Sequence, residues 1–209
     1  MSVLTDSLNR IMQWLEENRP DYAASFLPGL SDAEIREKLT NVELELPEEI
    51  YELYRWRNGV EDGEDLKSIA YPSMAFMSLD EAIKYHLDIV DNIDIQEHED
   101  FESIFELLDA NQVNNCSDKY LFPFLRANCC FCAVLLGKDK QKHSPIIDIS
   151  DALDLEMIFL SLTSMMQTLA KYFETGAYYL GEDNFLDWDE EKIEPIFQKY
   201  NPGLSFMNN

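Results

Sequence analysis

The chain has 209 residues, of which 46 % are hydrophobic and 12 % aromatic, so it can build a folded domain with its own core. It carries 41 Asp and Glu against 16 Lys and Arg, a formal net charge of −25. This charge makes nucleic acid a poor partner, because binding phosphates relies on Lys and Arg that release counterions. No apolar run reaches the length of about 18 residues that spans a membrane, and the N-terminus lacks the pattern of a secretory signal. We therefore expect a cytoplasmic protein.

The first part of the chain predicts helices. Residues 2–18 carry apolar side chains every three to four positions, which is typical of an amphipathic helix, and Pro20 predicts its end. The stretch 22–30 predicts a linker. Ser31 followed by Glu34 is a capping-box pattern and predicts the start of a short helix. We interpret 1–45 as an N-terminal helical extension packed on the main domain.

The stretch LPEEIYELYRWRNG, residues 46–59, predicts a second helix. Pro47 and the two acids after it suit a first turn, and an apolar stripe follows at helical spacing. Asn58-Gly59 predicts the end of the helix, because both residue types tolerate the left-handed conformation that closes helices. Trp56 is either a core plug or a platform for a ligand, and we expect the plug, since large aromatic side chains are mostly buried.

The middle of the chain combines a short strand with an acidic span. SMAFM, residues 73–77, predicts the strand, and Ser78 with Glu81 repeats the capping-box pattern at the start of a helix. Residues 85–118 then contain ten acids and neither Lys nor Arg. Apolar positions within this span predict two helical pieces that display the acids outward.

From Tyr120 the pattern changes to strands. Three apolar segments separated by polar turns, the last ending at Ser150, predict an antiparallel meander. Residues 161–176 predict a helix ended by Gly176, and 187–203 predict a last helix that contains Pro195. This order of elements favours an α+β fold, with an antiparallel or mixed central sheet wrapped by several helices.

No motif in the sequence predicts catalysis, a cofactor or a metal. The cysteines at 116, 129, 130 and 132 lack the spacing of zinc ligands, and we expect them to be reduced core residues. His86, His98 and His143 lie apart from any nucleophile motif, and the glycines fall singly at turns. An enzyme with a carboxylate site stays an alternative, because catalytic pairs cannot be chosen among 41 acids by sequence alone.

Four stretches in order resemble the SUKH superfamily, which includes bacterial toxin-immunity proteins and yeast regulators of cell-wall glucan synthesis. The stretch 46–59 matches the family's entry motif at Leu46, Pro47, Tyr54, Trp56, Asn58 and Gly59. The stretches 76–82, 120–136 and 161–180 are similar to its strand-then-helix segment, central hairpin and closing helix. Asn128 stands where the family often has an Asp/Gly-rich turn. The resemblance covers 46–180 as one SUKH-like domain and leaves 181–209 as a C-terminal helical extension.

The resemblance implies a protein-binding domain without enzymatic activity. We expect an immunity protein that neutralises a cognate bacterial toxin, such as a cationic nuclease, by direct binding. The alternative is a regulatory scaffold of the cell-wall type with no toxin partner, and the acidic surface is also compatible with solvation alone. The expected contacts with the partner are the acids of two neighbouring stretches: Glu61, Asp62, Glu64, Asp65, Asp88, Asp91, Asp94, Glu97, Glu99, Asp100 and Glu102.

Overall fold

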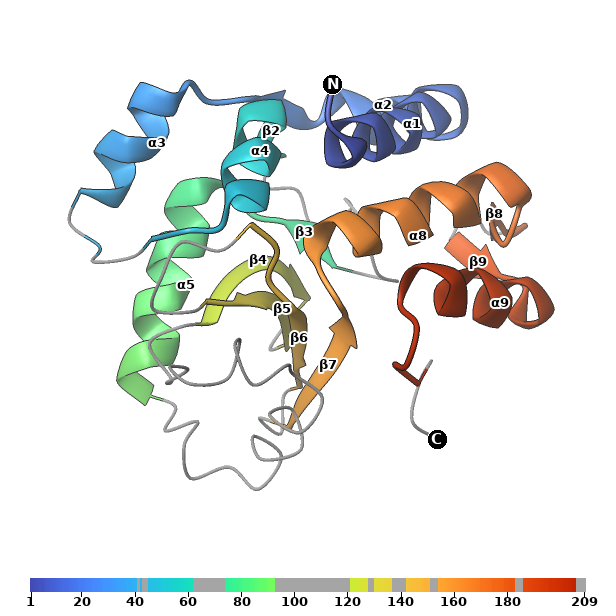
Figure 1. The fold of residues 1–209 in the computed structure, drawn as a ribbon. Helices are drawn as coiled ribbons and strands as arrows, with labels where there is room; N and C mark the ends of the chain where they lie inside the picture. The colour runs from blue at the N-terminus through green and yellow to red at the C-terminus, as the bar shows by residue number, and fades with distance from the viewer. Residues whose placement is uncertain are drawn as a thin grey trace.

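The structure is a computed structural model of the full chain. It describes residues 1–40, 42, 45–61, 74–92, 121–127, 130–136, 142–150, 154–182 and 186–205, and for 89–92 it describes the backbone alone. The fold is α+β, as predicted: helices surround a five-stranded sheet (Figure 1).

The central sheet has the strand order β3-β4-β5-β6-β7, and each neighbouring pair is antiparallel. The strands are β3 (Ala75–Phe76), β4 (Leu121–Ala127), β5 (Cys130–Leu135), β6 (Ile146–Ile149) and β7 (Leu155–Phe159). The predicted meander is thus confirmed, and β7 extends it beyond the prediction. Most side chains of β4 to β7 are buried, which explains why their sequences are nearly continuous apolar runs.

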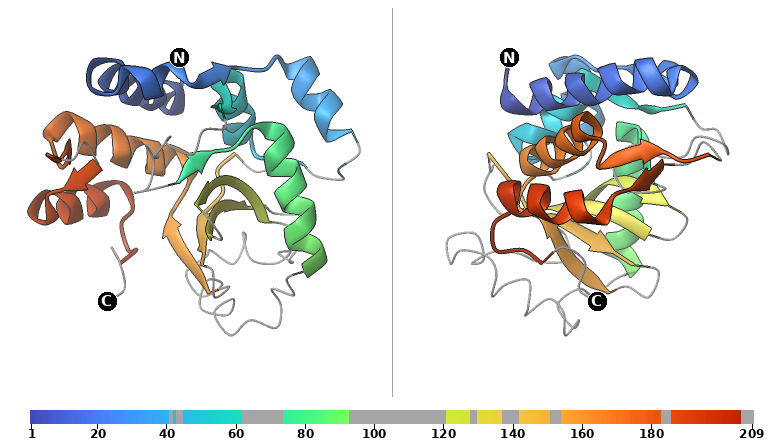
Figure 2. Two further views of the ribbon diagram at one scale, coloured as in Figure 1. Left: turned by 180° about the vertical axis from the view of Figure 1, so that it is seen from behind. Right: turned by 90° about the vertical axis from the view of Figure 1, so that its right-hand side faces the viewer.

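Three helices are stacked beside the sheet, with α8 in the middle (Figure 2): α1 (Val3–Asn18), α8 (Leu162–Thr175) and α9 (Glu190–Tyr200). All three were predicted. Helix α8 follows β7 along the chain and ends at Gly176, whose φ of 63° is the left-handed conformation expected there. Aromatic contacts join the stack; the rings of Trp14 and Phe173, for example, have centroids 4.4 Å apart.

Three further helices lie toward the other end of the molecule (Figure 1): α3 (Asp32–Leu39), α4 (Glu48–Trp56) and α5 (Leu79–Asn92). Helix α5 packs along β4. The two predicted capping boxes are confirmed, because Ser31 bonds reciprocally with Glu34 and Ser78 with Glu81. Their local hydrogen bonds fix where α3 and α5 begin.

The linker predicted for 22–30 is wrong. Residues Pro20–Ala24 form the short helix α2, and Phe26–Pro28 form strand β1, which pairs antiparallel with β2 (Arg57–Val60). The Leu30 N–H also donates to the Tyr54 carbonyl at 2.8 Å, at the end of α4. A second hairpin pairs β8 (Tyr178–Leu180) with β9 (Leu186–Trp188), and the sequence did not predict strands there. Such short strands depend on pairing partners that local sequence does not specify.

The stretch 46–59 has a different ending from the one predicted. Helix α4 stops at Trp56, and Arg57 already has an extended φ of −152°, so the chain passes straight into β2. The left-handed residue is Gly59, with φ +82°, inside that strand. Asn58 does not close α4; its Oδ1 accepts a hydrogen bond from the Leu79 N–H at 2.9 Å, at the start of α5.

The remaining residues of the 46–59 motif serve packing. Leu46 and Tyr54 are fully buried, and Pro47 is the residue that precedes the first turn of α4. The Trp56 ring is partly buried and packs edge-to-face against Phe26 at 5.7 Å, at the edge of the core. Its indole N–H donates to Asn9 Oδ1 at 3.0 Å, so its polar atom is also satisfied.

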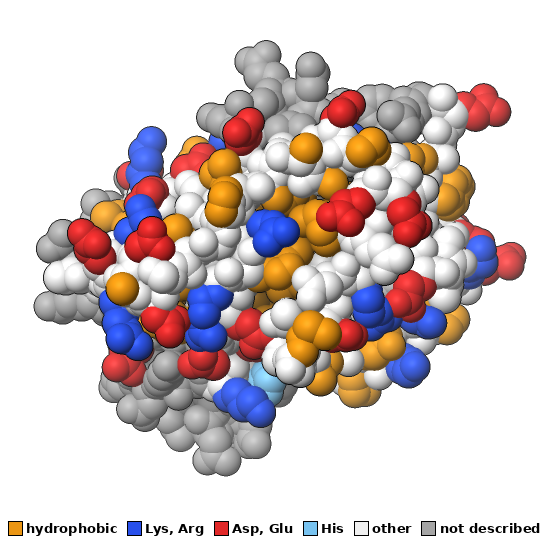
Figure 3. Space-filling model, turned by 90° about the horizontal axis from the view of Figure 1, so that it is seen from above, with side chains coloured by type: hydrophobic (Ala, Val, Ile, Leu, Met, Phe, Trp, Pro, Cys, Tyr) orange, Lys and Arg blue, Asp and Glu red, His pale blue; other side chains and the backbone are white. Residues whose placement is uncertain are grey.

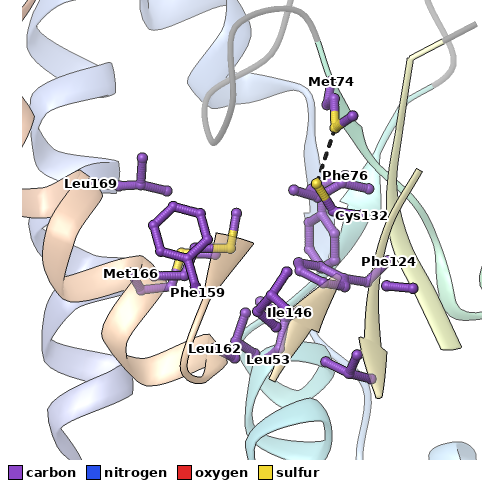
Figure 4. Close-up of a cluster of buried hydrophobic side chains, with 14 of the residues drawn as sticks. Leu53, Met74, Phe76, Phe124, Cys132, Ile146, Phe159, Leu162, Met166 and Leu169 are labelled. Carbon is purple, nitrogen blue, oxygen red and sulfur yellow. Dashed lines mark hydrogen bonds between the residues drawn. The ribbon is translucent and has the colours of Figure 1, made fainter. Parts of the chain in front are cut away.

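The core fills the space between α8 and the sheet (Figure 4). Met166 and Leu169 come from α8, Phe124 and Cys132 come from the sheet, and none of the four is more than 5 % exposed. The methionines of α8 are therefore core residues rather than an adaptable binding surface.

Candidate functional site

A buried carboxylate with an unused oxygen lies in the first turn of α4. Glu49 is only 5 % exposed. Its Oε1 accepts a hydrogen bond from the Thr163 backbone N–H at 2.9 Å and lies 2.9 Å from His143 Nδ1. Its Oε2 is buried and has no hydrogen-bond partner among the described residues. Since burying a charged oxygen without a partner is unfavourable, Oε2 is a candidate contact for a ligand.

Glu49 lies where the N-termini of α1, α4 and α8 come together. A helix N-terminus presents unpaired N–H groups and about half a positive charge. Glu49 bonds to the first turn of α8, and Glu52 accepts a hydrogen bond from the Thr5 backbone N–H, in the first turn of α1, at 2.9 Å. The Ser2 hydroxyl, at the cap of α1, also donates to Glu52. The helix ends therefore stabilise two carboxylates that are one turn apart.

A cleft of about 370 Å³ opens beside Glu49. Its walls come from the starts of α1, α4 and α8 and from the coil before β6, and its polar lining residues are Ser2, Glu48, Glu49, Glu52, Lys142, His143, Thr163 and Gln167. The His143 side chain is 49 % exposed, so it borders solvent as well as Glu49. Lys142 is exposed and forms no ion pair within the described part of the chain. The cleft is therefore open, polar and of mixed charge.

His143 contacts the same oxygen of Glu49 as the Thr163 N–H does, and it comes from the coil before β6. Its contact with Oε1 is an ion pair only when the imidazole is protonated, and is otherwise a neutral N–H···O hydrogen bond. The contact shows that Glu49 can accept a nitrogen donor arriving from the cleft. Because the imidazole is half exposed, it competes with water and is easier to displace than a buried partner.

The acids expected to contact a partner lie mostly outside the described residues. Glu61 is exposed directly after β2, and Asp88 is exposed on α5. Asp91 lies in α5, but its side chain is outside the described part of the chain. The others fall beyond it altogether: Asp62, Glu64, Asp65, Asp94, Glu97, Glu99, Asp100 and Glu102. Their role as contacts stays a prediction.

A second cavity, of about 40 Å³, has a purely apolar lining. It lies between α1, α4, α8 and the sheet, and its lining includes the ring of Tyr22. The Tyr22 hydroxyl is buried without a partner among the described residues, and burial raises its pKa. Figure 3 shows hydrophobic side chains at the bottom of a hollow on the upper face, with acidic and basic side chains around it. Apolar cavities of this size are ordinary packing voids.

The Cys132 thiol belongs to the core rather than to a reactive site. It is fully buried, 3.3 Å from Met74 Sδ (Figure 4) and 3.7 Å from Asp148 Oδ1. Burial and the nearby carboxylate raise the pKa of this thiol well above its usual range. Burial also raises the pKa of Asp148. A thiol held protonated in this way is a poor nucleophile and a poor metal ligand.

No group of three His, Cys, Asp or Glu side chains within the described ranges could hold a metal ion. No helix of the same ranges has the length and apolar character needed to cross a bilayer. The sequence matches no protein-family model and no curated protein. The fold and the site together define a class of protein: an α+β domain with a buried carboxylate beside an open polar cleft.

Glu49 was not singled out from the sequence. Glu48 and Glu49 were both interpreted as acids that favour the positive end of a helix. One signal was available: position 49 lies four residues before Leu53, so it falls on the buried stripe of α4. That spacing indicates a buried acid, but it does not reveal which partners surround it.

Proposed function

We propose that this chain is a SUKH-type protein-binding domain that acts as an immunity protein, neutralising a cognate bacterial toxin by direct binding in the cytoplasm. The observation that carries the proposal is the charge. With 41 acids and 16 bases, 25 carboxylates would lack a basic partner even if every Lys and Arg formed one ion pair. A surface of this kind attracts cationic proteins.

The charge suits one kind of toxin in particular. A nuclease must attract phosphates, and therefore carries a cationic groove. An acidic protein that occupies such a groove gains electrostatic complementarity, which acts mainly on the rate and specificity of association. Inhibition requires only that the groove be covered, so the proposal assigns no catalytic step to this chain. The order of the four SUKH-like stretches in the sequence supports the same class of partner.

The proposal is tested with the product of the gene that lies beside this one. We expect the purified product to bind this protein, and co-expression to protect cells from it. Association should be faster by about 10- to 1000-fold at low salt than at high salt, because electrostatic steering is screened by ions. Binding whose rate does not depend on salt would show that charge does not drive recognition. An isolated locus without a toxin gene would favour the regulatory scaffold instead.

The expected contact surface has its own test. Reversing Asp94, Glu97, Glu99 and Asp100 to Lys should slow association while the fold is kept. The matched control reverses four exposed acids on α1, α3 and α9: Glu16, Glu17, Glu37 and Glu194. Both variants change the net charge equally, so an equal loss of association rate would remove the first set as the contact surface.

A further inference from the structure

The cleft beside Glu49 contains an acceptor that no described part of the chain uses. Oε1 of Glu49 serves both Thr163 and His143, whereas Oε2 has no partner and the side chain is 5 % exposed. Buried polar atoms in folded proteins are nearly always paired, so an unpaired carboxylate oxygen next to an open cleft requires an explanation. The hydrogen bond to the start of α8 accounts for the burial of Oε1, but it does not account for the burial of Oε2.

We infer that this cleft is a binding site for a guanidinium group, the side chain of an arginine presented by a basic protein partner. A guanidinium is planar and has two parallel N–H donors that match both oxygens of one carboxylate. Glu49 offers one oxygen that already accepts a nitrogen donor and one that is unused. The inference rests on the proposed function for the source of the arginine, and on the geometry of the cleft for the site itself.

His143 is the occupant that the arginine would replace. His143 contacts Oε1, whereas Oε2 has no exposed surface in the present conformation, so a guanidinium reaches both oxygens only when the imidazole has left and the carboxylate has turned toward the cleft. His143 is half exposed and lies in the coil that precedes β6, so its side chain can rotate into solvent. The exchange replaces one N–H donor by two and satisfies Oε2.

The surroundings of Glu49 suit a cation with several donors. The Glu52 carboxylate lies one turn further along α4 and adds negative potential, while Thr163 and Gln167 provide polar atoms on the wall formed by α8. Lys142 opposes a cation, but its side chain is exposed and can extend into solvent. A volume of about 370 Å³ leaves room for a side chain rather than only for water.

The site can be tested with N-acetyl-L-arginine amide as the probe, titrated into the intact protein and followed by NMR. The reporters are the Thr163 backbone amide, which bonds to Glu49, and the ring signals of His143. We expect saturable shifts of both. Glu49→Gln should weaken binding by about tenfold or more, because it removes the charge that the guanidinium contacts. Glu37→Gln, at an exposed acid of α3, is the matched control and should not change it.

A second variant keeps the test decisive if Glu49→Gln fails to fold. His143→Ala removes the donor that competes for Glu49, so it should tighten binding of the arginine probe. We expect a change of about two- to fivefold, because a half-exposed contact such as that between His143 and Glu49 is weak. N-acetyl-L-lysine amide should bind more weakly, because an ammonium is a point charge that does not fit both oxygens. The inference is overturned if the shifts do not saturate, if they persist unchanged in Glu49→Gln, or if His143→Ala weakens binding.

The outcomes separate this site from the proposed function. If the arginine probe binds at Glu49 but no basic partner exists, the site stands and the immunity role fails. If the toxin binds with equal affinity to Glu49→Gln and to the wild type, the immunity role stands and the arginine site fails.

Discussion

Replacing Gly59 by Ala should be the most damaging single-methyl substitution in the 46–59 motif. Gly59 has a φ of +82°, in the left-handed region that residues with a Cβ rarely adopt. It also packs directly on the chain that leads into α5. A Cβ at this position would lie 2.4 Å from Ser78 N and 2.7 Å from the Met77 carbonyl carbon. Both are backbone atoms, so neither can move aside as a side chain would.

The positive φ and the steric clash of the Cβ each lower the unfolding free energy by a separate amount. Holding a non-glycine residue at positive φ costs about 1–2 kcal/mol. Forcing an extra carbon into a filled space adds about 1–3 kcal/mol. Gly176 provides the matched control, because its φ of 63° is also left-handed but nothing lies within 4 Å of a Cβ built there. Gly59→Ala should therefore lose about 2–5 kcal/mol of unfolding free energy, and Gly176→Ala only about 1–2 kcal/mol.

The measurement is urea unfolding followed by circular dichroism, on the wild type and both variants. The midpoints give the losses if the slope with denaturant is the same in all three proteins. A domain of ordinary stability, about 5–15 kcal/mol, would still fold with Gly176→Ala and be visibly weakened by Gly59→Ala. Equal losses in the two variants would refute the close approach of β2 to residues 77–78 as the reason for glycine at 59.

Three further predictions concern polar side chains that are buried or partly buried. Asn58→Ala should lower the unfolding free energy by about 1 kcal/mol, because it removes the acceptor for the Leu79 N–H. Asn58→Asp keeps an acceptor at this position and should restore the lost stability. Equal urea midpoints for the wild type and Asn58→Ala would contradict the role of Asn58 as a cap of α5. Tyr22→Phe should leave stability unchanged or raise it by about 1 kcal/mol, since the removed hydroxyl is buried and unpaired; a clear loss would reveal a partner for that hydroxyl. Burial lowers the pKa of His86 from its ordinary value of 6.5, so below that pH the unfolded chain binds the proton more readily than the folded one. The stability that this group contributes is thus complete above about pH 6.5 and is lost as the pH falls, by up to about 1.4 kcal/mol per pH unit. His86→Gln, whose amide can still donate to the Leu121 carbonyl, should lack this component when the two proteins are unfolded in urea at pH 7 and pH 5.

The elements that the sequence predicts correctly are those fixed by local chemistry. The capping boxes at Ser31 and Ser78 and the glycine end at Gly176 act within a few residues, so their patterns are readable without knowing the fold. The elements that were missed depend on distant partners. Strand β1 exists because it pairs with β2, and β7 because it pairs with β6. Asn58 combines the two cases. Its residue type correctly indicates a role at a helix end, but the helix that it caps is α5, which local sequence does not reveal.

The candidate site follows the same division. The buried position of Glu49 can be derived from its spacing to Leu53, which lies on the core side of α4. Its hydrogen bonds cannot, because His143 and Thr163 are about a hundred residues further along the chain and only the tertiary structure brings them to α4. The net charge favours the most acidic spans as contacts, whereas the unpaired buried oxygen lies on Glu49, within the 46–59 motif.

The two oxygens of Glu49 allow its contributions to stability and to binding to be separated. Oε1 accepts the Thr163 N–H at the start of α8, and the side-chain oxygen of Gln can do the same. Glu49→Gln should therefore lose only the charge–dipole contribution, about 0.3–1 kcal/mol, whereas Glu49→Ala also loses the hydrogen bond and should cost about 1–2 kcal/mol more. Urea unfolding measures both losses, and the arginine titration measures binding on the same samples. If the inference is right, Glu49→Gln keeps most of its stability and loses arginine binding. A variant that keeps both would show that Glu49 is a helix cap alone, and that the cleft beside it holds no guanidinium.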